Sequence, residues 1–224
     1  PTAVGDIWEH LVRPLPYESR FAVYDAWEAV SKATRDAGVR LRNAELGKRV
    51  QKALKLMGGQ AANKQGAAWL ARAAYINPVL VARETIANVQ LYDNLIPAAA
   101  EMCSGMGGLP HDVLARTLAS VLATDSREKL KDDGTNVSLW LSALCRFAAT
   151  FHTSYLNVDL RPLLTVVARR AALQGSPFEL RALEELVVKM SGVESIVDFS
   201  DALIESLGGG EVLRHQARTA RTPA

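Results

Sequence analysis

The chain has 224 residues, of which 49% are hydrophobic and 22% are charged, and its formal net charge is +2. This composition excludes disordered, collagen-like and fibrous proteins. The uncharged stretches are too short for a membrane-spanning helix, which needs about 20 apolar residues. Alanine and leucine occupy 34 and 29 positions, and this balance favours helix over sheet because alanine loses no side-chain entropy in a helix.

Apolar spacing predicts two helices in the first quarter of the chain. Residues 17–36 carry apolar side chains at spacings of three, and Gly38 is expected to end this helix. Residues 45–57 place apolar side chains on one face and basic side chains around the other, and two glycines at 58–59 are expected to end it.

The middle of the chain predicts three further helices and a break. Residues 65–76 form one helix, and Asn77 followed by Pro78 is typical of the N-cap and first position of the next, over 79–89. Pro97 predicts a kink or a restart within 92–104. Residues 105–110 are predicted to be a turn before a helix over 113–122.

The last third begins with a polar connection over 132–136, followed by a helix over 137–155. Asp159 is expected to cap a helix over 160–171. Ser176, Pro177 and Glu179 have the pattern of a capping box, which predicts the start of a helix with Leu183, Leu186 and Met190 on its apolar side. A short helix over 199–207 and a basic tail are expected after it.

No stretch alternates apolar and polar residues long enough to form a sheet, so we predict an all-α fold. Helix starts about 20 residues apart give hairpins of about 40 residues, the period of HEAT-like repeats. We favour an irregular α-solenoid of stacked hairpins over a compact bundle. Residues 1–207 are predicted to form the helical-repeat domain, and 208–224 a glycine-rich, basic C-terminal tail.

The sequence contains no pattern that predicts catalysis, a cofactor or a metal site, so a protein that is not an enzyme is expected. The four histidines lack partners at helical spacing, and Cys103 and Cys145 have neither metal nor disulfide spacing. The glycines within 105–108 faintly resemble a phosphate loop, but they follow a helix and are interpreted as a turn. We expect Cys145 to be a small buried side chain and His152 to be packed and hydrogen-bonded.

Charge is unevenly distributed along the chain. Residues 32–83 carry 11 basic and two acidic side chains, a charge of +9, whereas the remainder carries −7. Three interpretations of this segment stay open, namely a phosphate-binding patch, a contact for an acidic protein, and a solvated helix face. No aromatic residue is interleaved with the basic residues of 45–57, so base stacking is unsupported by sequence. The candidate surface, here called the basic face, consists of Arg40, Arg42, Lys48, Arg49, Lys52 and Lys55.

Several stretches resemble motifs of one family, the largest subunits of the THO complex. Asn77-Pro78 and residues 89–96 (VQLYDNLI) resemble its Asn-Pro and Gln-x-Tyr-Asn/Asp-Asn-Leu/Met-Ile pattern. Residues 129–141 (KLKDDGTNVSLWL) resemble its Leu-Lys-x-Asp-Gly-Thr-Asn-Ile-Ser-x-Trp-Leu, and residues 179–194 and 209–214 resemble two later motifs. The motif positions singled out are Tyr92, Asp93, Asn94, Asp133, Gly134, Thr135 and Asn136.

This resemblance implies a non-catalytic α-solenoid segment from the C-terminal half of a nuclear scaffold protein. It implies a role in messenger ribonucleoprotein assembly and in mRNA export coupled to transcription. The implied partners are other THO subunits and a DEAD-box RNA helicase, with possible RNA or DNA contact through the basic face and no membrane contact. The family supplies no catalytic residues, and the motif positions are expected to cap helices and fix turns. The alternative function is a nucleic-acid-binding helical module that uses the face over 40–55.

Overall fold

The structure is a computed structural model, and it describes residues 2–55, 60–124, 128–130, 137–174, 178–191 and 211. The chain divides into two units, Pro1–Ser191 and Gly192–Ala224, and all elements considered below belong to the first. The expected helix over 199–207, the boundary at 207/208 and, apart from Glu211, the tail over 208–224 lie outside the described residues.

The described residues form an all-α fold, as predicted, and they contain no strand beyond the isolated bridge between Leu130 and Val137. Short π-helical (η1) and 3₁₀ (η2 and η3) segments connect some of the α-helices. In chain order the elements are α1 (Thr2–Ile7), η1 (Trp8–Val12), α2 (Tyr17–Ala33), α3 (Ala37–Lys55), α4 (Gln60–Ile76), α5 (Pro78–Val89), η2 (Asp93–Leu95), α6 (Ile96–Met102), η3 (Cys103–Gly105), α7 (Gly108–Ala123), α8 (Leu139–Ser154), α9 (Arg161–Gln174) and α10 (Leu180–Ser191).

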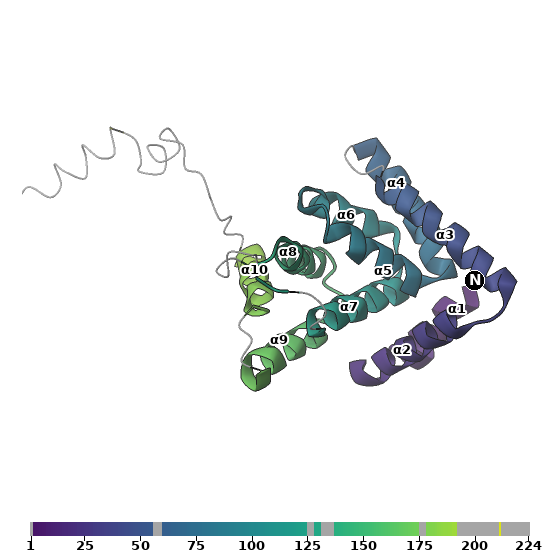
Figure 1. Cartoon of the computed structure of the whole chain (residues 1–224), viewed down its shortest axis with the longest axis horizontal. Coiled ribbons are helices and arrows are strands. Elements are labelled where there is room, and N and C mark those ends of the chain that lie inside the picture. The colour runs from purple at the N-terminus through teal and green to yellow at the C-terminus, as the bar shows by residue number, and fades with distance from the viewer. Residues whose placement is uncertain are drawn as a thin grey trace, which may run out of the picture. The chain divides into compact units, whose positions relative to one another are not determined.

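From α3 onward, each helix packs against the helix two positions away. The helices α3, α5, α7 and α9 contact one another in that order, and α4, α6, α8 and α10 do the same (Figure 1). Neighbours in sequence such as α3 and α4, or α9 and α10, also touch. This two-layer arrangement is the packing expected of stacked helical hairpins. The helix α2 departs from it, because it contacts α7.

Local start signals explain several helix boundaries. Asn77 is the N-cap of α5, and its side-chain oxygen accepts a hydrogen bond of 3.1 Å from the amide of Leu80. Pro97 lies in the first turn of α6, so the helix restarts there as predicted. Asp159 accepts a hydrogen bond of 3.0 Å from the amide of Arg161, the first residue of α9. These three predictions are confirmed.

Gly38 was expected to end a helix, and this is wrong. The helix α2 already ends at Ala33, and α3 begins at Ala37, so Gly38 lies in its first turn. The reason is the side chain of Asp36, which accepts a hydrogen bond of 3.0 Å from the amide of Val39 and caps the helix start. In consequence α3 runs over 19 residues and begins at Ala37, eight residues upstream of the start at 45 that the apolar pattern indicates.

The predicted turn at 105–110 is shorter than expected, because α7 begins at Gly108 and Pro110 lies in its first turn. The predicted capping box involves Ser176, Pro177 and Glu179. Glu179 precedes α10, and its carboxylate lies 2.7 Å from the ammonium of Lys129, fully buried. Ser176 and Pro177 lie outside the described residues.

The core is one cluster of apolar side chains that runs through the array and includes Leu54, Leu70, Leu118 and Phe147, all at most 1% exposed. The helix α10 joins this core differently from the prediction. Leu186 is buried as expected, but Leu183 and Met190 are exposed, because Ala182 lies on the face that packs against α8.

A buried polar cluster fixes α2 to α7. The guanidinium of Arg20 donates to both carboxylate oxygens of Asp112 at 2.7 and 3.1 Å, and the hydroxyl of Tyr24 donates to the same carboxylate at 2.7 Å. The indole of Trp8 donates to that hydroxyl at 2.7 Å, and Asp159 lies 3.5 Å from the guanidinium. Charge pairing outweighs the cost of burial and raises the pKa of Arg20, so this guanidinium stays charged.

Candidate functional site

The basic face lies entirely on α3, including Arg40 and Arg42, which the sequence placed before the helix. Its six side chains are all exposed, and within the described part of the chain none of them has a hydrogen-bond or ion-pair partner. Lys48, Lys52 and Lys55 project opposite the buried Leu46 and Val50, at helical spacings of four and three. The six charges therefore lie open along a helix about 28 Å long.

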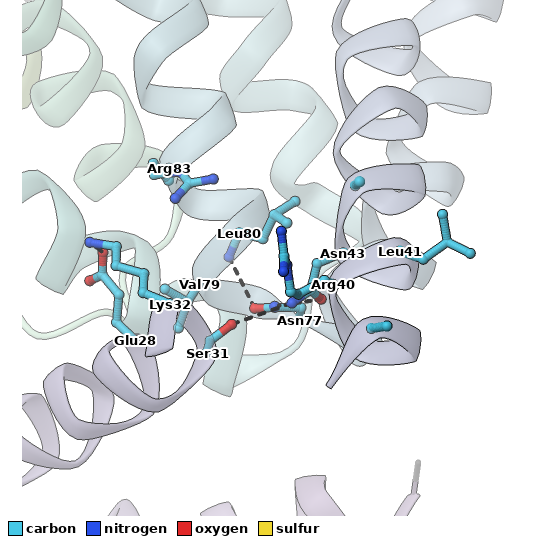
Figure 2. Close-up of a pocket in the computed structure, with 12 residues that line it drawn as sticks. Glu28, Ser31, Lys32, Arg40, Leu41, Asn43, Asn77, Val79, Leu80 and Arg83 are labelled. Atoms are coloured by element: carbon cyan, nitrogen blue, oxygen red, sulfur yellow. Dashed lines mark hydrogen bonds and ion pairs between the residues drawn. The ribbon is translucent and has the colours of Figure 1, made fainter. Parts of the chain in front are cut away.

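Arg40 also lines a pocket between α2, α3 and α5 with a volume of about 690 Å³. Figure 2 shows Lys32 of α2 turned toward Glu28, with Arg83 of α5 above them in this view. Lys32 pairs with Glu28 at 2.6 Å, and Arg83 pairs with Glu84 at 3.4 Å. Of the basic groups in this pocket, only Arg40 is without such a pair in the described structure.

The floor of this pocket is a chain of polar contacts. Asn77 donates to the amide oxygen of Asn43 at 3.3 Å, and Asn43 donates to the hydroxyl of Ser31 at 3.5 Å (Figure 2). Burial opposes the charged form of Glu28, but hydrogen bonds from Lys32 and Arg116 outweigh it and lower its pKa. The carboxylate of Glu28 therefore stays ionised and paired with Lys32 and Arg116. The polar contacts around this pocket mainly hold the three helices together.

A second pocket lies where α3 meets α4 and has a volume of about 600 Å³. Arg49 and Lys52 of the basic face line it together with Ala53, and Gln65 and Trp69 of α4 complete it. The indole of Trp69 is 46% exposed. Among the described residues, no acidic side chain lines this pocket.

Trp69 is the residue that the sequence pattern missed. It lies 17 positions beyond Lys52, outside the basic helix, and nothing in its own spacing indicates that it returns to that helix. The hairpin of α3 and α4 brings the two together. No aromatic residue lies among the basic residues of 45–57 in the sequence, but Trp69 lines a pocket beside Arg49 and Lys52 in space.

The first group of motif positions lies in the connection between α5 and α6. Tyr92 precedes the 3₁₀ segment η2, which contains Asp93 and Asn94, and all three side chains are exposed. The carboxylate of Asp93 lies 3.9 Å from the guanidinium of Arg146 on α8. The second group, Asp133, Gly134, Thr135 and Asn136, lies outside the described residues.

The cysteines and the buried histidines occupy structural positions. Cys145 is fully buried, as predicted, and burial raises the pKa of its thiol to about 12. The Nδ1 of His152 lies 2.8 Å from the carbonyl oxygen of Ala148, which confirms a packed, hydrogen-bonded side chain. In the residues that the structure covers, no three His, Cys, Asp or Glu side chains converge as metal ligands. No helix among them is long and apolar enough to cross a membrane.

Comparison with known proteins gives one consistent result. Residues 70–145 match the Thoc2 family model, described as a transcription- and export-related complex subunit. The chain is 30% identical over 216 residues to THO complex subunit 2 of Arabidopsis thaliana, and 28% identical over 211 residues to THO complex subunit 2 of Homo sapiens. These alignments cover 96% and 93% of this chain but only 12% and 13% of the relatives. The chain therefore spans about an eighth of the length of the curated relatives it matches.

Proposed function

Because the chain belongs to the family of THO complex subunit 2, we propose that it is a non-catalytic scaffold segment of a THO complex. Its role is to hold other THO subunits and to help load a DEAD-box RNA helicase during messenger ribonucleoprotein assembly. The place of action is the nucleus, where transcription is coupled to mRNA export. The description of the matching family as a transcription- and export-related complex subunit supports this role.

The observation that carries the proposal is the packing of each helix on the helices two positions away. Arrays of this kind present extended surfaces on which partner proteins bind, and they need no enclosed pocket for that purpose. The buried contacts between α2 and α7 add rigidity to one end of the surface. A rigid surface loses little conformational entropy when a partner binds.

The chemistry of the described residues supports a role without catalysis. The pKa of each of the two thiols is raised to about 12 by burial, so neither is a thiolate nucleophile at neutral pH. The two buried histidines contact backbone carbonyls and aromatic rings. These groups stabilise packing and do not converge on a shared cavity.

Affinity purification of the intact parent protein, with this segment either present or replaced by a flexible linker, tests the proposal. We expect the linker version to lose at least one THO subunit and to recover less DEAD-box helicase. Equal recovery of all partners would contradict the scaffold role. Measurement of nucleotide or ester hydrolysis by the purified chain provides the second arm, in which any turnover would contradict a non-catalytic role.

A further inference from the structure

We propose that the pocket between α3 and α4 is a contact site for single-stranded RNA, in which Trp69 stacks on a base while Arg49 and Lys52 bind the flanking phosphates. The site goes beyond the scaffold role, although the choice of RNA over DNA rests on the proposed function. The observation that supports this site is an exposed indole beside cations that, among the described residues, have no ion-pair partners.

The charge of the site fits a polyanion. Arg49 and Lys52 are joined on the same helix by Lys48 and Lys55, and Lys48, Lys52 and Lys55 follow one another at steps of about 6 and 4.5 Å along its axis. Among the described residues, none of these four side chains pairs with a carboxylate. A nucleic-acid strand that follows α3 would meet these unpaired cations one after another. Phosphate contacts of this kind supply most of the sequence-independent affinity for nucleic acid.

The apolar part of the site distinguishes a nucleic acid from an acidic peptide. Trp69 lines the pocket and is 46% exposed, and Ala53 provides an apolar neighbour. A planar base can stack on the indole, and such stacking contributes most of the base-dependent affinity of single-strand sites. Gln65, also in the lining, has an amide that can donate to or accept from a base edge. The carboxylates of an acidic peptide would bind the cations but would not stack on the indole.

A duplex fits this site less well than a single strand, because its bases are already stacked and cannot reach the indole. The pocket volume of about 600 Å³ leaves room for a base between the two helices. The predicted ligand is therefore unpaired RNA that crosses α3 near its C-terminal half.

Fluorescence anisotropy with a short fluorescein-labelled oligouridine and the purified chain tests the site. We expect Trp69→Leu to weaken binding by about fivefold or more, because base stacking is lost, and Trp69→Phe to retain most of the affinity. Arg49→Glu with Lys52→Glu should make the log-log salt slope shallower by about 1.4, at about 0.7 for each phosphate contact. The matched control is Arg169→Glu with Lys189→Glu, which makes the same charge change at exposed positions on α9 and α10 and should leave binding unchanged.

Each alternative has its own outcome. Equal affinity of Trp69→Leu and the unchanged chain would overturn the site, and so would equal weakening by the control pair. Oligoglutamate that competes as well as oligouridine would assign the basic face to an acidic partner. Tighter binding of the DNA oligonucleotide of the same sequence would overturn the choice of RNA. Circular dichroism of each variant verifies folding. Because no THO subunit is present, failure here leaves the scaffold proposal intact.

Discussion

Arg20 of α2 and Asp112 of α7 are 92 residues apart and form a buried pair, with a guanidinium nitrogen 2.7 Å from the carboxylate. Both side chains are only 7% exposed. The pair lies in the contact between α2 and α7, by which α2 departs from the regular order of the array.

Asp112→Asn tests the energetic role of this pair. The substitution leaves the guanidinium of Arg20 buried without its main counter-charge, and we expect a loss of about 3–5 kcal/mol in the free energy of unfolding. Urea denaturation monitored by circular dichroism measures it. Arg146→Ala, which removes an exposed ion pair with Asp93, is the control and should cost less than about 1 kcal/mol. Similar effects of the two variants would contradict the proposed importance of burial.

The buried imidazoles predict that stability falls as the pH is lowered through 6.5. Burial lowers the pKa of His111 and of His152, whereas in the unfolded chain both titrate near 6.5. Below that value the unfolded state binds protons that the folded state does not, so stability is lost by up to about 1.4 kcal/mol per pH unit for each histidine. Among the described residues the Nδ1 of His111 has no hydrogen-bond partner, so protonation there would bury an unpaired charge.

Urea midpoints between about pH 5.5 and 7.5 measure this dependence. The double variant His111→Gln with His152→Gln keeps a side-chain amide that can contact the same carbonyl oxygens of Cys103 and Ala148, and it should flatten the profile. An unchanged slope in that variant would refute the assignment to these two side chains.

Substitution by alanine is expected to change the stability in opposite directions at two glycines. At Gly108 a Cβ would lie 2.6 Å from the ring of Trp8, whose nitrogen is fixed by its hydrogen bond to Tyr24, so Gly108→Ala should cost about 1–3 kcal/mol. At Gly47, inside α3, no described atom beyond its chain neighbours and the nearby helix backbone lies within 4 Å of an added Cβ. Gly47→Ala should therefore stabilise the chain by about 0.5–1 kcal/mol. Thermal unfolding distinguishes the two, and a stabilising Gly108→Ala would rule out the close contact.

The burial of the two thiols predicts that they react slowly with a thiol reagent in the native chain. Cys103 and Cys145 are both fully buried, and burial raises each pKa to about 12. In the native chain neither should react with Ellman's reagent within minutes, whereas both should react after unfolding in urea. Rapid reaction of one thiol in the native state would show that the packing around it opens locally.

The sequence was sufficient for the fold class and for the helix starts that depend on adjacent residues. Asn77 with Pro78 and Asp159 with Arg161 form their caps within a few positions, so local pattern predicts them. Gly38 was misinterpreted because the cap at Asp36, two residues earlier, overrode the usual helix-ending role of glycine.

The candidate site was only partly predictable, because its components come from different helices. Four of the six cations could be placed on one helix from their spacing, but the positions of Arg40 and Arg42 depend on where α3 begins, and that of Trp69 depends on how the hairpin of α3 and α4 closes. The pairing of Arg20 with Asp112 could not be predicted from the sequence for the same reason. A lone arginine on an amphipathic helix is usually solvated, and only the tertiary contact shows that this one is buried.

The alternation of contacts along the array has a kinetic consequence. The helices from α3 to α10 meet partners close in sequence, so their association needs only short loops to close, whereas α2 must find α7 across most of a hundred residues. We therefore expect the array to assemble first and α2 to dock late. The Arg20–Asp112 pair would then slow unfolding while contributing little to the rate of collapse.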